Sequence, residues 1–214
     1  MSTNRQDPLA APEEAVATSG TRKVPRPKQK RPAARRVPPR AQRHGLLIVH
    51  TGDGKGKTTA ALGLLLRAAG RGMSVGMFQF IKSAEFGYGE HHAARTLGVE
   101  IIALGDGFTW LTENIEQDRA LAAEGWARCR ETLAAGTYDM LILDELTYPL
   151  IFGWLDTADV LAAIAARPAG THVVVTGRDA PEALIAAADL VTEMQVIKHP
   201  HKDKGIGAQP GIEM

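Results

Sequence analysis

The stretch LLIVHTGDGKGKTTAALGLL, residues 46–65, decides the fold of this chain. Its first five residues are mostly apolar and partly β-branched, which predicts a buried strand. A loop with three glycines in five positions follows, and the leucines of TTAALGLLLRAA, residues 58–69, then recur at helical spacing. A strand, a glycine-rich turn and a helix start in direct succession are typical of a phosphate-binding loop.

The residue types in this loop suit the anionic oxygens of phosphates. Glycines let the backbone curl and direct successive N–H groups at one anion, and a helix N-terminus adds donors and the positive end of its dipole. Lys57 can reach the outer phosphates, and the hydroxyl of Thr58 can bind Mg²⁺ or Mn²⁺. We therefore expect a bound nucleoside triphosphate. The expected nucleotide-binding residues of this stretch are Thr51, Gly52, Asp53, Gly54, Lys55, Gly56, Lys57, Thr58 and Thr59.

Thr51 departs from the general pattern of such loops, G-x-x-x-x-G-K-[ST], because it stands where the first glycine is expected. The alternative interpretation is a glycine-rich turn that only connects a strand to a helix. The sequence GKT between a predicted strand and a predicted helix favours phosphate binding, because that context supplies a mechanism.

The length and composition predict one folded domain with a basic extension. The chain has 214 residues, of which 44% are hydrophobic, enough for a sizeable core. Residues 1–43 carry 11 Lys and Arg against three acidic residues, whereas the rest of the chain carries 14 basic and 21 acidic residues. The net charge of +1 therefore combines a basic leader, at +8, with an acidic body, at −7.

Residues 1–43 contain seven prolines and almost no large apolar residues, so they predict a disordered tail, and residues 44–214 predict the folded domain. A solvated extension without a specific ligand is favoured over an arm that contacts nucleic acid, an acidic partner or the acidic body of the chain itself. A mitochondrial targeting peptide is disfavoured, because the prolines oppose an amphipathic helix.

Cys129 is the one cysteine of the chain, which excludes an internal disulfide and a thiolate zinc cage. It lies in a predicted amphipathic helix, where a small buried residue is favoured over a reactive thiol. No apolar run has the length needed to span a bilayer, and no signal-peptide pattern opens the sequence. These features predict a cytoplasmic protein without a membrane partner.

Further apolar segments alternate with helical ones along the chain. Beyond the first strand, strands are predicted at residues 74–80, 99–104, 140–145, 171–176 and 191–199. The alternation predicts at least five mostly parallel strands with helices on both faces. The predicted fold class is therefore α/β, a three-layer fold of the phosphate-loop (P-loop) nucleotide-hydrolase type.

The segment MLILDE, residues 140–145, ends an apolar run in two acids. A fully apolar strand is typical of a central parallel strand that is covered on both faces. If this strand neighbours the first one, Asp144 or Glu145 lies beside the phosphate loop and can hold magnesium together with Thr58, directly or through water. The alternative is a strand that ends at the surface in solvated acids.

Other candidates follow strands, at the edge where open α/β sheets bind ligands. Gln79 and Lys82 end the second strand, although a surface lysine that closes a strand is an equal alternative. Arg178 follows another strand, where a guanidinium suits phosphate or carboxylate. Phe108 and Trp110 stand in a glycine-containing loop, and the residues alone leave open whether they stack on a flat ligand or cap the core.

The histidines do not form a convincing metal-binding pattern. His91 and His92 are adjacent and would point in different directions on a helix, so a solvated pair is expected. His199 and His201 flank a proline, which favours the end of an extended strand.

The folded part of the chain contains, in this order, the motifs TGDGKGKTTAALG, FQFIK, GDGFTW, LDELTY, VVVTGRDA, VIKH and KGIGAQPGIE. With these motifs the chain resembles the ATP:corrinoid adenosyltransferases of the CobA/BtuR/CobO type. The resemblance covers residues 45–214 and leaves out the basic tail. Thr51 looks normal for this family, whereas SAEFGYGE, residues 83–90, differs from its tryptophan-containing versions.

The resemblance implies transfer of the 5′-deoxyadenosyl group of ATP to a reduced corrinoid: cobyrinic acid a,c-diamide, cobinamide or cobalamin. In similar enzymes cobalt(I) attacks the ribose C5′ and inorganic triphosphate leaves, in adenosylcobalamin biosynthesis or salvage. The resemblance assigns Lys57 to the leaving triphosphate, and Arg67 and Arg178 to the nucleotide. It places Phe108 and Trp110 against the lower face of the corrin. It also implies a homodimer and a flavoprotein electron donor.

Two other functions remain alternatives. A P-loop ATPase or small-molecule kinase would use the same loop but would release phosphate or ADP instead of triphosphate. The chain lacks the arginine-rich lid that small-molecule kinases usually carry. A nucleic-acid-binding regulator would use ATP as a switch and residues 1–43 as its arm. Nucleic acid is the less favoured partner, because the body of the chain is acidic.

Overall fold

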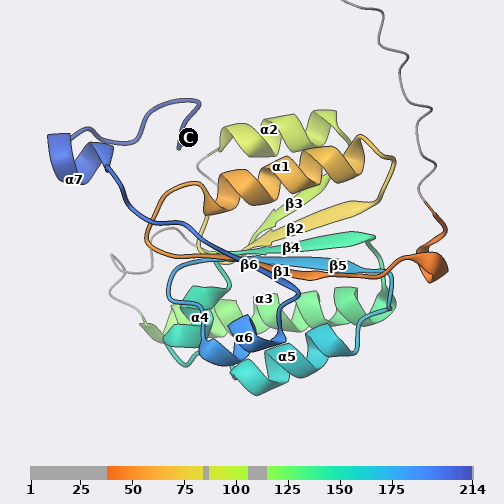
Figure 1. Ribbon diagram of the computed structural model, residues 1–214. Coiled ribbons are helices and arrows are strands. Elements are labelled where there is room, and N and C mark those ends of the chain that lie inside the picture. Colours follow the sequence, from red (N-terminus) through yellow and green to blue (C-terminus); the bar gives the residue numbers. More distant parts are fainter. Residues whose placement is uncertain (1–37, 84–86, 106–114, 214) are drawn as a thin grey trace, which may run out of the picture. The chain divides into compact units, whose positions relative to one another are not determined.

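A six-stranded sheet is the centre of the computed structural model, which describes residues 38–83, 87–105 and 115–213 (Figure 1). The strands lie in the order β3, β2, β4, β5, β1, β6, and each neighbouring pair is parallel. This arrangement confirms the predicted α/β class and its mostly parallel sheet. The strands are β1 (Leu47–Thr51), β2 (Val75–Gln79), β3 (Glu100–Ala103), β4 (Met140–Asp144), β5 (His172–Thr176) and β6 (Leu190–Glu193).

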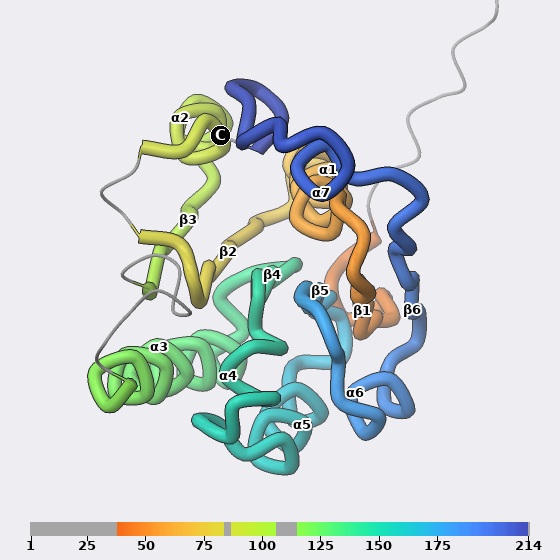
Figure 2. Tube along the Cα trace, turned by 90° about the vertical axis from the view of Figure 1, so that its left-hand side faces the viewer, coloured from red at the N-terminus to blue at the C-terminus, as the bar shows by residue number. Residues whose placement is uncertain are grey.

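Helices cover both faces of the sheet, as Figures 1 and 2 show. One face carries α1 (Lys57–Ala69) and α2 (Gly89–Thr96). The opposite face carries α3 (Ile115–Ala135), α4 (Thr147–Ile151), α5 (Thr157–Ala165) and α6 (Glu182–Ala187). The three predicted layers are therefore present. Within the described residues, no helix combines the length and apolar character that a membrane crossing requires.

Successive strand residues alternate between two hydrophobic clusters, one on each face of the sheet. Leu143 and Val175 belong to the cluster that also contains Cys129 of α3. Ile142 and Val174 belong to the cluster that contains the buried residues of α1. Strands that are buried on both faces explain why their sequences are continuous apolar runs. Cys129 is fully buried, as predicted, and burial raises the pKa of its thiol.

The chain departs from the predictions after its last strand. β6 ends at Glu193, whereas the sequence pattern extended the strand to residue 199. A short helix, α7 (Pro200–Lys204), begins after His199, whose Nδ1 accepts a hydrogen bond from the N–H of Lys202 at 3.2 Å. The predicted extended end at this site is therefore wrong. Proline at the first helical position has a suitable φ and lacks an N–H that would otherwise be unpaired.

Residues 38–43, the end of the expected tail, contact the body of the chain. They include a short 3₁₀ helix, η1 (Arg40–Gln42). The guanidinium of Arg40 donates to the backbone carbonyl of Tyr138 and to the hydroxyl of Thr171. Arg43 Nη1 lies 2.8 Å from Asp139 Oδ1. The packed part of the chain thus begins before the predicted boundary at residue 44, so the prediction of a disordered tail is wrong for residues 38–43. The remainder of that tail, residues 1–37, lies outside the described ranges.

Candidate active site

The predicted phosphate loop connects β1 to α1 at the carboxyl edge of the sheet. Gly52 and Gly56 have φ angles of +91° and +110°, in the region that favours glycine. A Cβ on Gly52 or Gly54 would lie 2.6 Å from the carbonyl oxygen of Met194, and the N–H of Gly54 donates to that oxygen at 2.6 Å. The loop therefore requires glycine at these positions, and it is held against the residue that follows β6.

The Lys57 side chain lies inside the loop. Its Nζ donates to the carbonyl oxygens of Gly52, at 2.6 Å, and Gly54, at 2.8 Å, and only 6% of the residue is exposed. Burial lowers the pKa of the ammonium, and the charge of Glu145 partly opposes this shift. A cation that is desolvated in this way interacts strongly with an anion, so the loop presents a positive charge where a triphosphate would lie.

Asp144 joins the loop to the neighbouring strands. It is the last residue of β4 and is fully buried. Its Oδ1 accepts hydrogen bonds from the hydroxyls of Thr58, at 2.9 Å, and Thr176, at 2.6 Å. Its Oδ2 accepts a hydrogen bond from Nε2 of Gln79 at 3.1 Å. The predicted meeting of Thr58 with an acid of MLILDE is therefore present in the structure.

The route by which these residues meet differs from the predicted one. The prediction depended on β1 and β4 being neighbours, but β5 lies between them. The first turn of α1 packs over this region of the sheet and brings Thr58 to Asp144. Thr176, at the end of β5, fills the position between the two strands and bonds to Asp144.

Glu145 supplies a second acid at the same edge. Its φ of +59° is uncommon for a residue with a side chain, and its N–H donates to the hydroxyl of Thr176 at 2.9 Å. Its Oε2 is buried and has no hydrogen-bond partner among the described residues. Burial, with the charge of Asp144, raises the pKa of the Glu145 carboxyl to about 7. A buried acid with an unfilled acceptor position suits a bound cation.

Hard oxygen donors of the kind that Mg²⁺ and Mn²⁺ prefer thus gather around Thr58, Asp144 and Glu145. No group of three or more His, Cys, Asp or Glu side chains is arranged for a metal ion within the described part of the chain. A cation at this place would therefore need the Thr58 hydroxyl, nucleotide phosphates and water as further ligands. Magnesium ions in nucleotide-binding sites are usually coordinated in this way.

Two basic residues that were predicted to bind the nucleotide lie at the rim of the loop. Lys55 Nζ is 3.1 Å from Glu213 Oε1, and Arg178 Nε is 4.0 Å from Asp53 Oδ1. The side chains of Lys55 and Arg178 are 46% and 40% exposed, respectively, so both retain access to solvent. Their pairs with acids are open to exchange for phosphate oxygens.

Three further predicted residues are placed differently. The hydroxyl of Thr51 accepts a hydrogen bond from the N–H of Ala180 at 3.2 Å, so this residue ties the loop to the segment after β5. Thr59 is exposed on the first turn of α1. Arg67 is exposed in the last turn of α1, about 15 Å along the helix axis from Lys57. The structure does not bring Arg67 to the loop.

A family model for ATP:corrinoid adenosyltransferase BtuR/CobO/CobP matches residues 43–214. The chain belongs to this family. It is 46% identical to the corrinoid adenosyltransferase of Pseudomonas aeruginosa over 171 residues, which cover 79% of this chain and 83% of the relative. It is 41% identical to corrinoid adenosyltransferase CobA of Salmonella typhimurium over 178 residues, which cover 83% of this chain and 90% of the relative. The resemblance inferred from the motifs is thereby confirmed.

One solved structure that this chain matches is the flagellar accessory protein FlaH from Methanocaldococcus jannaschii. The match covers 71% of this chain and 71% of the FlaH chain, with a TM-score of 0.47 and 15% sequence identity.

Two residues of this candidate site were not predicted from the sequence, and a third was predicted wrongly. Thr176 and Met194 were not singled out, because a threonine and a methionine at strand ends carry no distinctive pattern. The prediction of a solvated histidine pair is wrong for His91, whose Nε2 lies 2.6 Å from Oε1 of Gln79. Lys82, a predicted site candidate, forms an ion pair with Glu90.

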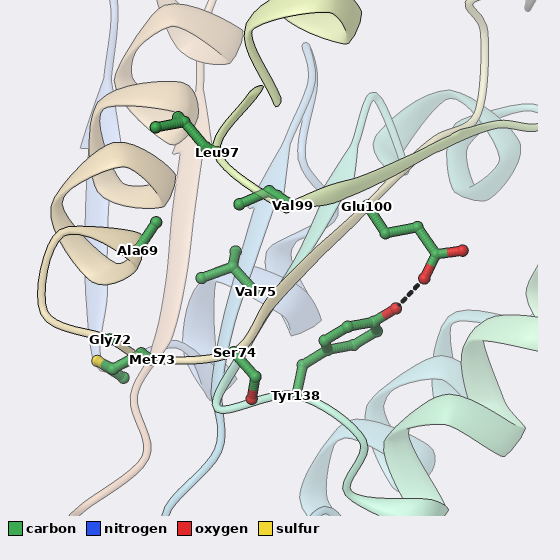
Figure 3. Close-up of a pocket in the computed structure, with 10 residues that line it drawn as sticks. Ala69, Gly72, Met73, Ser74, Val75, Leu97, Val99, Glu100 and Tyr138 are labelled. Carbon is green, nitrogen blue, oxygen red and sulfur yellow. Dashed lines mark hydrogen bonds between the residues drawn. The ribbon is translucent and has the colours of Figure 1, made fainter. Parts of the chain in front are cut away.

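Phe108 and Trp110, the predicted corrinoid-binding residues, lie outside the described ranges. A cavity of about 460 Å³ elsewhere in the adenosyltransferase is shown in Figure 3. Its lining includes Val75 and Glu100, the first residues of β2 and β3, so it lies at the amino edge of the sheet, opposite the phosphate loop. It is therefore not part of the candidate active site.

Replacing Glu145 with glutamine should change how stability depends on pH. A carboxyl with a pKa of about 7 in the folded protein and about 4.5 when unfolded destabilises the fold as the pH rises between these values. As the pH rises from 5 to 8, the free energy of unfolding of Glu145→Gln should therefore increase relative to that of the parent, by up to about 3 kcal/mol. Urea unfolding without nucleotide at several pH values measures this. Parallel pH profiles would contradict the prediction.

Replacing His50 with phenylalanine should stabilise the protein. His50 is 7% exposed, burial lowers its pKa, and neither ring nitrogen has a hydrogen-bond partner among the described residues. An apolar ring removes this desolvated polar group and should raise the free energy of unfolding by about 1 kcal/mol. His50→Leu is the control, because it also removes the polar nitrogens but has no ring. A loss of stability in both variants would show that the imidazole has a hydrogen-bond partner in solution.

Proposed function

We propose that the chain transfers the 5′-deoxyadenosyl group of ATP to the cobalt(I) of a corrinoid and releases inorganic triphosphate. The observation that supports this most is the buried ammonium of Lys57 inside the glycine-rich loop, beside the cluster of Thr58 and Asp144. This arrangement suits a chain of phosphates. The proposed reaction needs no nucleophilic side chain, because the cobalt is the nucleophile.

The proposed role of the loop is to retain the leaving group. A bond forms between cobalt and the ribose C5′ while the bond between C5′ and a triphosphate oxygen breaks, and its electron pair leaves with the triphosphate. Negative charge therefore grows on the phosphates during the reaction. Lys57 and backbone N–H groups of the loop would stabilise this charge, and their contacts with the phosphates would hold C5′ in line with the cobalt.

Thr58, Asp144 and Glu145 would hold Mg²⁺ or Mn²⁺ in this proposal. The unpaired buried Oε2 of Glu145 fits such a role, whereas both oxygens of Asp144 already accept hydrogen bonds. Asp144 would therefore bind through water or orient the Thr58 hydroxyl. When bound, the ion would neutralise part of the charge on the triphosphate.

An anaerobic assay with ATP and chemically reduced corrinoid tests the proposed function. Adenosylated corrinoid and triphosphate should appear in equal amounts. Release of ADP or single phosphates with unmodified corrinoid would instead support the P-loop ATPase or kinase alternative. The same assay with cobyrinic acid a,c-diamide, cobinamide and cobalamin identifies the preferred acceptor.

Trp110→Ala should impair the reaction from cobalt(II) more than the reaction from cobalt(I). In this proposal, Phe108 and Trp110 would crowd the lower face of the corrin and displace its axial ligand, which would make cobalt(II) easier to reduce. Initial rates with a reductant and cobalt(II), and with pre-reduced cobalt(I), measure the difference. Equal losses in both assays would mean that Trp110 only packs.

We further propose a cytoplasmic homodimer that receives electrons from a flavoprotein. The exposed apolar residues Ile197 and Ile212, 86% and 74% exposed, are compatible with contact to another chain. Sedimentation velocity tests the dimer, and a reduced flavoprotein in place of the chemical reductant tests the donor. Salt-dependent nucleic-acid binding that is lost without residues 1–37 would support the regulator alternative.

A further inference from the structure

His91 lies at one end of a chain of hydrogen bonds that leads to the phosphate loop. Its Nε2 is 2.6 Å from Oε1 of Gln79, and Nε2 of Gln79 is 3.1 Å from Oδ2 of Asp144. Oδ1 of Asp144 in turn accepts the hydroxyl of Thr58 at 2.9 Å. The chain links α2, β2, β4 and the first turn of α1.

The chemistry of these groups fixes the direction of each hydrogen bond. The Asp144 carboxylate accepts, so the NH₂ group of Gln79 must face it, and the carbonyl oxygen of Gln79 must face His91. His91 therefore donates through Nε2–H. The pKa of Glu90 is consistent with this orientation of the amide. Burial alone would raise the pKa, but hydrogen bonds from Lys82 and from the NH₂ group of Gln79 lower it overall.

The His91 ring packs against Tyr88, which is itself held by Lys82. Its ring meets the ring of Tyr88 edge to face, with the centroids 5.5 Å apart. Lys82 lies over the same Tyr88 ring, 4.6 Å from its centroid, and pairs with Glu90. The Gln79 amide is 1% exposed, so water cannot replace the donor that His91 provides.

We propose that His91 is a positioning residue that acts through Gln79 to hold the Asp144 carboxylate, and with it the Thr58 hydroxyl, in the orientation that a metal–nucleotide complex needs. Without His91, the buried carbonyl oxygen of Gln79 loses its hydrogen-bond donor, and the side chain can shift to find another one. Such a shift would lengthen the hydrogen bond from Nε2 of Gln79 that orients the Asp144 carboxylate. The inference rests on the metal site of the proposed function.

The test compares ATP binding with and without Mg²⁺. By titration calorimetry, His91→Phe, which keeps a ring but has no N–H, should lower the affinity for ATP in the presence of Mg²⁺ about tenfold. Its affinity for ATP in the presence of EDTA should equal that of the parent. His91→Gln, whose amide can donate to Gln79, should restore most of the loss. His92→Phe, a change at the exposed neighbour, is the matched control and should bind like the parent.

Each outcome has a distinct meaning. Equal affinities of His91→Phe and the parent with Mg²⁺, or equal losses with and without Mg²⁺, would overturn the inference, as would no rescue by His91→Gln. A parent whose affinity for ATP does not depend on Mg²⁺ would instead overturn the proposed metal site. If His91→Phe does not fold by circular dichroism, His91→Leu, which also lacks an N–H, replaces it under the same criteria.

Discussion

Lys57→Ala should lower kcat/KM for adenosyl transfer about 10³-fold, because the loop loses the cation that we propose stabilises the leaving triphosphate. The ammonium of Lys57 is buried and is held by two loop carbonyls, so it is already oriented before the nucleotide arrives. Removal of one oriented donor to a developing anion typically has an effect of this size. The anaerobic assay described above measures it.

The fold should tolerate this change. Burial lowers the pKa of Lys57, so its charge is held in the folded protein against a desolvation penalty. The melting temperature of Lys57→Ala should therefore equal or exceed that of the parent. Lys55→Ala is the comparison variant in the same loop and should lower kcat/KM less than Lys57→Ala does, because Lys55 is exposed and paired with Glu213. Near-parental turnover of Lys57→Ala would remove the loop from the mechanism.

Asp144→Ala should abolish activity and also destabilise the protein. The buried carboxylate accepts hydrogen bonds from Thr58, Thr176 and Gln79, and alanine would leave these groups without their acceptor. We expect a loss of about 3 kcal/mol in the free energy of unfolding, since each unsatisfied buried group costs about 1–3 kcal/mol and water fills part of the space. Turnover should fall at least about 10³-fold.

Asp144→Asn removes the negative charge but keeps the size and shape of the side chain. The amide occupies nearly the same volume and keeps one acceptor oxygen, so its stability should lie closer to that of the parent, whereas turnover should remain low. Asp139→Asn is the control, because Asp139 directly precedes the same strand at its other end and pairs with Arg43. It should alter stability but leave kcat unchanged. Full activity of Asp144→Asn would contradict the role assigned to this carboxylate.

Local patterns predicted most of the elements, because strands that are buried on both faces leave continuous apolar runs. The strand–loop–helix at the phosphate loop and the short helix with His91 and His92 both follow from spacing along the chain. The end of β6 did not follow, because Val196 and Ile197 look like strand residues although they are exposed beyond the sheet. Their apolar character thus reflects something other than burial in this chain.

The site was predictable only where its residues stand in a recognisable local sequence. Lys57, Thr58 and the acids of MLILDE met that condition. Thr176 and His91 did not, because their roles depend on the order of the strands and on where α2 packs. The presence of β5 between β1 and β4 brings Thr176 to Asp144, and no spacing along the chain encodes that order.

The left-handed backbone at Glu145 has a consequence for protein engineering. Programmes that seek heat resistance often place glycine or asparagine wherever a bulkier residue adopts a positive φ, since the strain at such a residue is of order 1 kcal/mol. Glu145, at +59°, is among the first positions that such a survey would select. We expect such a variant to be more stable but less active, because it would lose the carboxyl group of Glu145 that we propose helps to hold the metal ion. Thermostable versions of this enzyme should be sought elsewhere along the chain.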